Sequence, residues 1–81
     1  MGLARSKPLL PLSNLILANI VSSILISLLP DIRAALVPGG TAILSGILVD
    51  EMQDFATVVE SNDWRIVDQY QEGAWYALAI R

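Results

Sequence analysis

Four polar residues stand beside apolar runs, where a side chain can meet a ligand: Asn19, Ser45, Asp50 and Glu51. The 81 residues include no histidine and no cysteine, so the usual general base, the commonest metal ligand and the thiolate nucleophile are all missing. Ser45 has no partner base, and helix capping and solvation explain Asp50 and Glu51 as a pair. No catalytic residue and no metal ligand are therefore predicted, and any chemistry must work without them.

Asn19 is the strongest candidate for a ligand-binding side chain. It closes a short apolar run, residues 15–18 (LILA), which is typical of a strand buried on both faces of a parallel sheet. Open α/β sheets bind ligands at the carboxyl ends of such strands, where Asn19 would lie. A purely structural interpretation stays open, in which Asn19 caps the helix or turn that follows.

An apolar stripe predicts a helix directly after this strand. Ser22 or Ser23 can cap the helix, and Pro30 is expected to break or kink it and to open a second short piece. The residues that share the apolar face are Ile24, Leu25, Leu28, Leu29, Ile32 and Leu36.

A second strand and a second helix follow a turn. Residues 37–40 (VPGG) predict the turn, and residues 41–47 (TAILSGI) predict a buried strand. Gly46, near the end of that strand, permits either a strand-end turn or a close backbone approach. Asp50 is expected to cap the second helix, with Gln53 completing a capping box. Its apolar stripe consists of Met52, Phe55, Ala56 and Val59.

The chain ends in two strand-like segments, residues 64–71 and 74–81, joined around Gly73. So short a connection with glycine predicts an antiparallel hairpin. The fold class is therefore α/β: two parallel strands with a crossover helix, a second helix and a C-terminal antiparallel hairpin. Residues 1–12 are expected to be an irregular lead-in and residues 13–81 the domain. Trp64, Tyr70, Trp75 and Tyr76 could stack on a ligand, but the expected role of aromatic residues in such a hairpin is to pack over the small core.

Composition excludes one class of partner and leaves one rival interpretation. The net charge is −3 and the five basic residues are scattered, so no nucleic-acid partner is expected. Residues 9–30 carry no charge, which also fits a small single-span membrane protein. Pro11, Asn14 and Asn19 interrupt that stretch and make the membrane interpretation the weaker one.

Several motifs, in order, resemble the ribosomal-protein methyltransferase family known as PrmA, which methylates large-subunit protein eleven. They are residues 18–21 (ANIV), 38–40 (PGG), 44–48 (LSGIL) and 72–75 (EGAW), and the resemblance covers residues 15–81. Val21 stands where the family has leucine, and Ala74 where it often has an acid. The resemblance implies the C-terminal half of a Rossmann-like, class I methyltransferase domain.

The resemblance also implies functional roles. S-adenosylmethionine is the family's cofactor, Asn19 would contact it near the transferred methyl group, and Ile20 and Val21 would line the substrate pocket. The substrate would be a ribosomal protein, methylated at a lysine or other amine, and the location cytoplasmic. The family's glycine-rich cofactor loop and ribose-binding acid have no counterpart among these 81 residues. We therefore expect a methyltransferase fragment that is inactive alone and binds the cofactor weakly or not at all.

A non-catalytic, dimerising interaction module is the third interpretation. The strand around residues 15–19 would have a neighbour on each side in a complete sheet of this class. Here its outer neighbour is missing, which leaves unpaired backbone groups on an apolar edge. The sequence therefore predicts self-association through residues 15–19.

Overall fold

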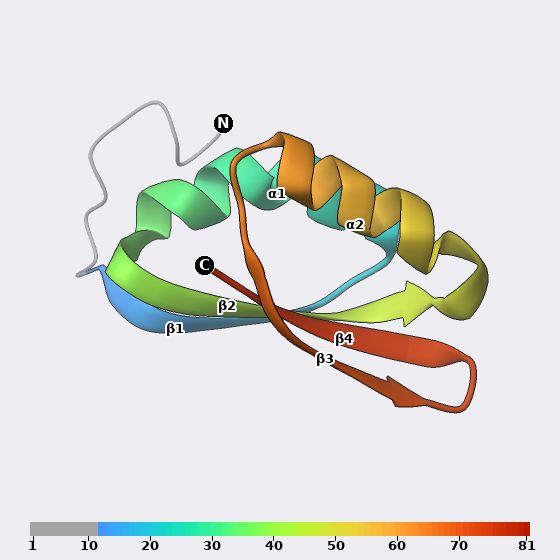
Figure 1. Ribbon diagram of the computed structural model, residues 1–81. Helices are drawn as coiled ribbons and strands as arrows, with labels where there is room; N and C mark the ends of the chain where they lie inside the picture. The colour runs from blue at the N-terminus through green and yellow to red at the C-terminus, as the bar shows by residue number, and fades with distance from the viewer. Residues whose placement is uncertain (1–11) are drawn as a thin grey trace.

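The computed structural model describes residues 12–81 and shows a mixed α/β fold (Figure 1). Residues 1–11 of the predicted lead-in lie outside the described residues, so the division of the chain at residue 12 stays a prediction. The elements in chain order are β1 (Ser13–Asn19), α1 (Ser22–Ala35), β2 (Leu36–Leu48), the 3-10 turn η2 (Val49–Glu51), α2 (Met52–Ser61), β3 (Ile66–Glu72) and β4 (Trp75–Ile80).

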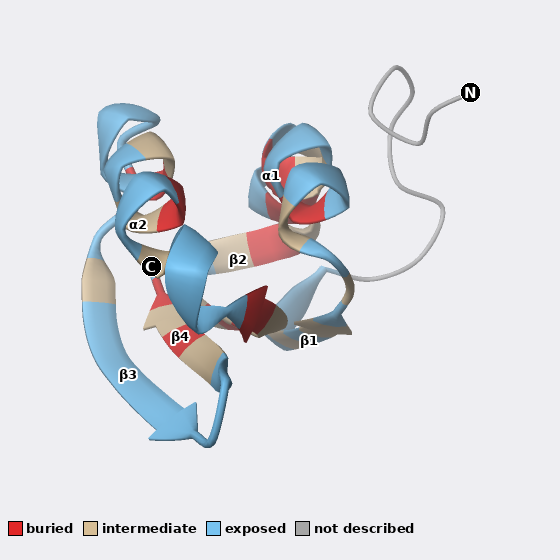
Figure 2. Cartoon of the chain, turned by 90° about the vertical axis from the view of Figure 1, so that its right-hand side faces the viewer, coloured by how far each residue is buried: buried red, intermediate tan, exposed pale blue. Residues whose placement is uncertain are grey.

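The four strands form one sheet in the order β1-β2-β4-β3. β1 and β2 are parallel and joined by α1, whereas β4 is antiparallel to both β2 and β3. This arrangement confirms the predicted fold class, including the crossover helix and the terminal hairpin. Both helices lie on the same side of the sheet in Figures 1 and 2, so residues 12–81 form two layers and leave the other sheet face bare.

The core lies between the helices and the face of the sheet that they cover. Both predicted helical stripes point into it, although Ile24 at the edge of the first stripe is exposed. The alternating residues of β2 and β4 supply the other wall. The buried residues are Leu25, Leu29, Ile32, Leu36, Ala42, Leu44, Ile47, Phe55, Val59, Trp64, Leu78 and Ile80.

The prediction that β1 is buried on both faces is wrong. Ile16 and Ala18 pack against the core, but Leu15 and Leu17 are 51% and 70% exposed. The two crossovers, from β1 to β2 and from β2 to β3, progress in the same direction across the sheet. They therefore place both helices on one face, and the other face of β1 has no cover among residues 12–81.

The prediction that Pro30 divides the first helix is also wrong, because α1 runs from Ser22 to Ala35 with Pro30 inside it. Proline removes one backbone donor from the helix. Leu29 and Ile32, on either side of Pro30, are both buried. Packing of both turns against the sheet offsets the lost hydrogen bond and keeps the helix in one piece.

Neither predicted helix cap forms. The N-cap of α1 is Val21, whose carbonyl accepts bonds from the backbone of Ile24 and Leu25, and no side chain caps this end. Ser22 instead donates from Oγ to Glu51 Oε1 at 2.9 Å, which joins the start of α1 to η2. Because η2 occupies residues 49–51, α2 begins only at Met52, beyond the reach of an Asp50 cap.

The predicted turn at residues 37–40 is an irregularity inside β2 rather than a separate loop. Ser13 pairs with Leu36 but Leu15 pairs with Thr41, so β2 carries extra residues between these positions. Gly39 has φ +81°, a conformation that L side chains rarely adopt. The residues that would end a strand elsewhere form a β-bulge here, because β1 continues the ladder on both sides of it.

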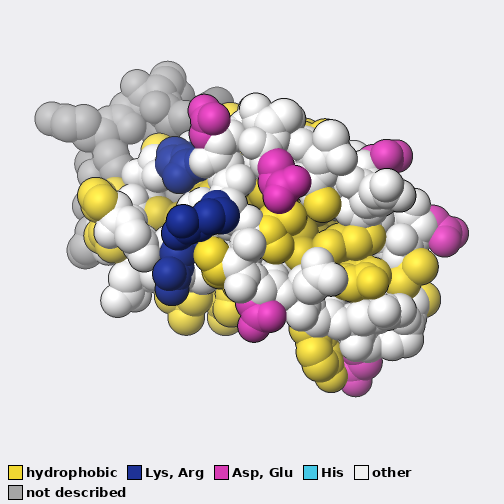
Figure 3. Space-filling model, in the orientation of Figure 1, with side chains coloured by type: hydrophobic (Ala, Val, Ile, Leu, Met, Phe, Trp, Pro, Cys, Tyr) yellow, Lys and Arg dark blue, Asp and Glu magenta, His cyan; other side chains and the backbone are white. Residues whose placement is uncertain are grey.

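The surface carries few charges, and in Figure 3 the acidic side chains are scattered while basic ones gather in one area. Exposed hydrophobic side chains fill much of the space between them on that face. Within residues 12–81, no helix is long and apolar enough to cross a membrane. The stretch behind the membrane interpretation is divided between β1 and α1 in its described part, so that interpretation is wrong for these residues.

Candidate functional site at the carboxyl edge of β1 and β2

Asn19 lies where the parallel strands end, as predicted. It pairs with Ser45 of β2, and the next backbone amide, that of Ile20, still donates to the Ser45 carbonyl at 3.3 Å. The chain then leaves the sheet and enters α1 at Ser22. Backbone hydrogen bonds therefore hold Asn19 in the sheet, at the last position before the chain leaves it.

Gly46 makes room for the Asn19 side chain. Its φ is +86°, and the pairing of β2 with β4 shifts between Ser45 and Ile47, so a β-bulge lies at this glycine. A Cβ atom at Gly46 would lie 2.8 Å from Asn19 Oδ1 and 3.0 Å from the Ile20 carbonyl oxygen. Only glycine therefore allows the two strand ends to approach this closely, and the close-approach interpretation of Gly46 is the one observed.

The Asn19 carboxamide is free to meet a ligand. Its side chain is exposed, and it makes no hydrogen bond to another residue of 12–81. The alternative that Asn19 caps the next helix does not hold, because α1 has Val21 as its N-cap and no side-chain cap. The Asn19 carboxamide, the polar group best placed at this edge, therefore has no structural hydrogen bond within residues 12–81.

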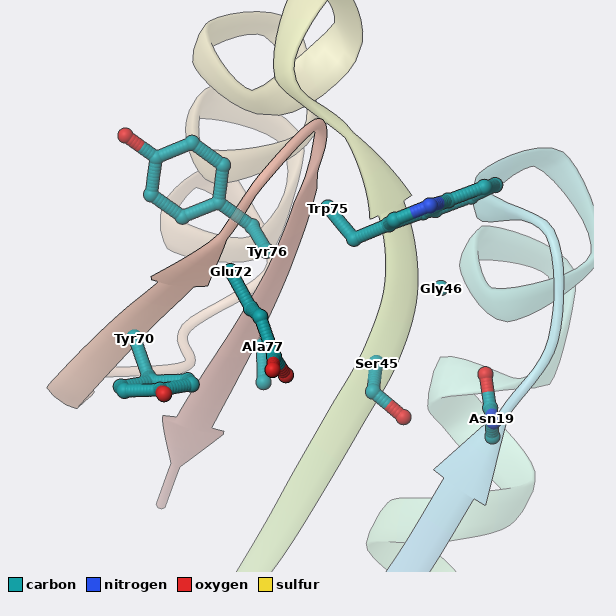
Figure 4. A pocket seen from close by; sticks show the side chains of 8 residues that line it. All are labelled: Asn19, Ser45, Gly46, Tyr70, Glu72, Trp75, Tyr76 and Ala77. Atoms are coloured by element: carbon teal, nitrogen blue, oxygen red, sulfur yellow. The ribbon is translucent and has the colours of Figure 1, made fainter.

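A depression of about 470 Å³ opens beside Asn19 on the face of the sheet that the helices leave bare (Figure 4). This is a volume typical of small-ligand pockets. Strand pairing explains the lining: Asn19 is opposite Ser45, Ser45 opposite Ala77, and Ala77 opposite Tyr70. Paired residues share a face, so four strands contribute to one surface. The lining residues are Asn19, Ser45, Gly46, Tyr70, Glu72, Trp75, Tyr76 and Ala77.

The hairpin gives this depression aromatic and acidic character. Tyr70 and Trp75 are 64% and 51% exposed, and Glu72 pairs with Trp75 across the hairpin. In Figure 4 the Trp75 indole reaches toward Asn19, and Tyr70 and Glu72 lie on the β3 side, whereas Tyr76 points away. Exposed rings beside a carboxylate are suited to a cationic or amine-bearing group.

The other residues considered for the site have structural positions or lie exposed outside the depression. Ile20 packs partly against the core, and Val21 is exposed at the start of α1; neither lines the depression. Their role at a substrate pocket stays a prediction. Ser45 donates from Oγ to the Ala18 carbonyl at 3.5 Å. Among residues 12–81, no group of three or more acidic, histidine or cysteine side chains could hold a metal ion.

Sequence reasoning did not select Tyr70, Glu72 and Trp75 as residues of the site. Packing over the core is the preferred expectation for Trp64, Tyr70, Trp75 and Tyr76, and it is correct for Trp64, which is buried, and for Tyr76, which packs against the core. The spacing of two between Tyr70 and Glu72 does place them on one face of a strand. Which face that is depends on the hairpin register, and the sequence does not state it.

An α/β sheet with an open carboxyl edge, a carboxamide without a partner among residues 12–81 and an aromatic, acidic depression defines an α/β protein with a candidate ligand site at that edge. Comparison with known proteins identifies its family. The family described as Ribosomal protein L11 methyltransferase (PrmA) matches residues 5–81. The chain belongs to this family.

Individual relatives agree with the family assignment. The chain is 42% identical over 65 residues to a ribosomal protein L11 methyltransferase of Desulforapulum autotrophicum, covering 80% of the chain and 22% of that relative. It is 41% identical over 68 residues to one of Caulobacter sp., covering 84% of the chain and 24% of the relative. The chain thus spans about a quarter or less of the length of these curated relatives.

A solved structure shows the same fold. The ribosomal protein L11 methylase from Lactobacillus delbrueckii subsp. bulgaricus superposes with a TM-score of 0.78 at 32% sequence identity. The match covers 84% of this chain and 35% of that one. The predicted partial Rossmann-like methyltransferase sheet and the predicted family are therefore both confirmed.

Proposed function

We propose that this chain forms the acceptor side of an S-adenosylmethionine-dependent methyltransferase site, and that it has no methyltransferase activity alone. The proposed acceptor is an amine of ribosomal protein L11, the protein that its relatives are named for. The family assignment also supports a cytoplasmic location. The observation that carries the proposal is the unused Asn19 carboxamide, held over Gly46 at the entrance to the depression.

The residues of the depression suit an amine acceptor. The carboxylate of Glu72 and the exposed rings of Tyr70 and Trp75 attract an ammonium group and cover its alkyl stem. Once the amine is neutral, the Asn19 carboxamide oxygen accepts one N–H bond and directs the nitrogen lone pair. Positioning of this kind contributes a large share of catalysis in a direct displacement.

The residues also fit one side of the cofactor. Asn19 and the close approach at Gly46 would hold the end that carries the reactive group, and S-adenosylmethionine supplies an electrophilic methyl group on its sulfonium. The family's glycine-rich cofactor loop, which would bind much of the rest of the molecule, has no counterpart among these 81 residues. We infer that this chain alone binds the cofactor weakly or not at all.

A chimera tests the proposed function. The matched segment of the Desulforapulum autotrophicum relative is replaced by the corresponding residues of this chain, and methyl transfer to L11 is measured. We expect an active chimera. Asn19→Ala is expected to lower kcat about 100-fold, because one transition-state contact is lost. Trp75→Ala is expected to raise KM more than it lowers kcat.

Val67→Ala is the matched control, since Val67 is an exposed hydrophobic residue of β3 outside the depression. It should leave kcat and KM unchanged. A folded chimera that transfers methyl groups equally well with and without Asn19 would contradict the proposal. Circular dichroism of each variant separates this result from misfolding.

A further inference from the structure

β1 is an edge strand without the features that usually protect such an edge. It stands first in the sheet order, and no strand within residues 12–81 pairs with its outer side. Ser13–Asn19 contains no charged residue, and Leu15 and Leu17 are strongly exposed. Such an edge is a template for another strand.

The opposite edge of the sheet differs. β3 carries Asp68 and Glu72, and the irregularity in its pairing with β4 places an extra residue in β3 itself, between Ile66 and Asp68. The irregularity in the β1–β2 pairing places its extra residues in β2 and not in β1. Charged side chains and bulges are two common means of blocking edge pairing. The asymmetry marks β1, rather than β3, as the edge available for association.

The β1 sequence is complementary to itself in the antiparallel direction. Around Ile16 as a centre, Leu15 of one copy lies opposite Leu17 of a second copy, and Ser13 lies opposite Asn19. Leucine thus meets leucine on the bare face, and polar residues meet at both ends. An antiparallel pair of identical strands is favoured by this pattern, because directly opposite side chains contribute most to strand pairing.

α1 adds a second apolar row along the same edge. Arg33 stacks on Trp64 and so marks the side of α1 that faces α2. At 100° per residue, Ile24 lies on the opposite side of the helix from Arg33, above the outer edge of β1. Ile24 is 47% exposed and Leu28, one turn further, packs only partly against the core. A partner at the β1 edge would cover both residues.

We propose that two copies of this chain associate through β1, antiparallel about a two-fold axis at Ile16. The two four-stranded sheets then form one continuous eight-stranded sheet, with the two α1 helices side by side above the junction. A symmetric interface of this kind is self-complementary, so it closes at two copies.

Light scattering of the full chain during size-exclusion chromatography tests the association. From low to high micromolar concentration, we expect the mass to rise toward twice the chain mass of 8.8 kDa. Leu15→Lys/Leu17→Lys should remain monomeric and folded, whereas the control Val67→Lys, on the opposite edge, should still dimerise. A monomer at every concentration, or equal loss of dimer in both variants, would overturn the proposal.

Charge and disulfide pairs test the register. In Leu15→Glu/Leu17→Lys, each new carboxylate faces the partner's new ammonium, so this variant should dimerise although the double lysine variant does not. The chain has no cysteine, so engineered thiols have no background. A mixture of Leu15→Cys and Leu17→Cys chains should cross-link faster than either variant alone. Faster cross-linking of each single variant would show parallel pairing and would overturn the antiparallel arrangement.

Discussion

Gly46 and Asn19 form the smallest unit of this site. The glycine adopts φ +86° and leaves 2.8 Å between a would-be Cβ atom and the Asn19 carboxamide oxygen. Real Cβ atoms do not approach oxygen so closely, so any side chain at position 46 must displace Asn19 or the strand end. The position of the Asn19 carboxamide, the proposed acceptor-binding group, thus depends on the absence of a side chain at Gly46.

Gly46→Ala is expected to destabilise the chain more than Gly39→Ala. Both glycines have positive φ near +80°, so each substitution costs about 1–3 kcal/mol of backbone strain. Only Gly46 adds a steric clash, since a Cβ atom at Gly39 meets nothing within 4 Å. Urea denaturation, followed by tryptophan fluorescence at one protein concentration, measures the difference.

A double variant identifies the clashing group. Asn19→Ala removes the carboxamide oxygen, so it should recover part of the stability lost in Gly46→Ala, a coupling of neighbouring residues. The recovery is partial, because the Ile20 carbonyl oxygen also lies 3.0 Å from the added Cβ atom. Additive effects of the two substitutions would show that the glycine and the asparagine do not contact each other as described.

At the residue scale, the sequence predicts the Asn19 side of the candidate site but not the side formed by the hairpin. Asn19 could be found because it ends an apolar run, and the end of a parallel strand is a fixed place in the sheet. Tyr70, Glu72 and Trp75 could not be assigned to the site, because their side depends on the registers of β3 with β4 and of β4 with β2. A shift of one residue in the first pairing would turn Tyr70 and Glu72 to the other face, and a shift in the second would turn Trp75.

At the scale of elements, Arg33 and Trp64 join the two helices. The Arg33 guanidinium carbon lies 3.8 Å from the centre of the Trp64 ring, and Nη2 donates to the Asp63 carbonyl at 3.0 Å. Asp63, with φ +68°, follows the end of α2, and Trp64 is buried directly after it. Arg33 therefore fixes the end of α2 against α1.

Arg33→Ala is expected to lower the free energy of unfolding by about 1–2 kcal/mol, because it removes a cation–π contact and a charged hydrogen bond. Arg65→Ala is the matched control, since its exposed side chain has no such contact within residues 12–81. The control should change stability by less than about 0.5 kcal/mol. Equal losses in both variants would mean that total charge, and not this contact, is responsible.

The elements themselves were predictable, but their ends were not. Hydrophobic periodicity predicts both helices, because each stripe must face one core. Short apolar runs predict the parallel strands, and the short connection at Gly73 predicts the hairpin. The uninterrupted helix at Pro30 and the bulge at Gly39 depend on partners distant in sequence, the sheet below α1 and the β1 ladder. A proline inside a helix and a glycine inside a strand each lower stability locally. Tertiary packing decides whether the native structure contains them nevertheless.

At the scale of the whole molecule, both helices cover one face, and the other face carries the depression and the exposed leucines of β1. The sequence suggested two-sided burial because LILA has no alternation. Such a run is typical of a sheet covered on both sides. The bare face and the open edge explain why a chain of this composition, 54% hydrophobic, has so much exposed apolar surface.

Calorimetric titration with S-adenosylhomocysteine, the product form of the cofactor, measures whether this chain holds the cofactor by itself. We expect no binding heat from the folded chain, alone or as a dimer, and clear binding by the chimera with the Desulforapulum autotrophicum relative. This pair of results would mean that the chain folds into a methyltransferase site but does not supply the bulk of the cofactor site. Micromolar binding by the chain alone would contradict the proposed function.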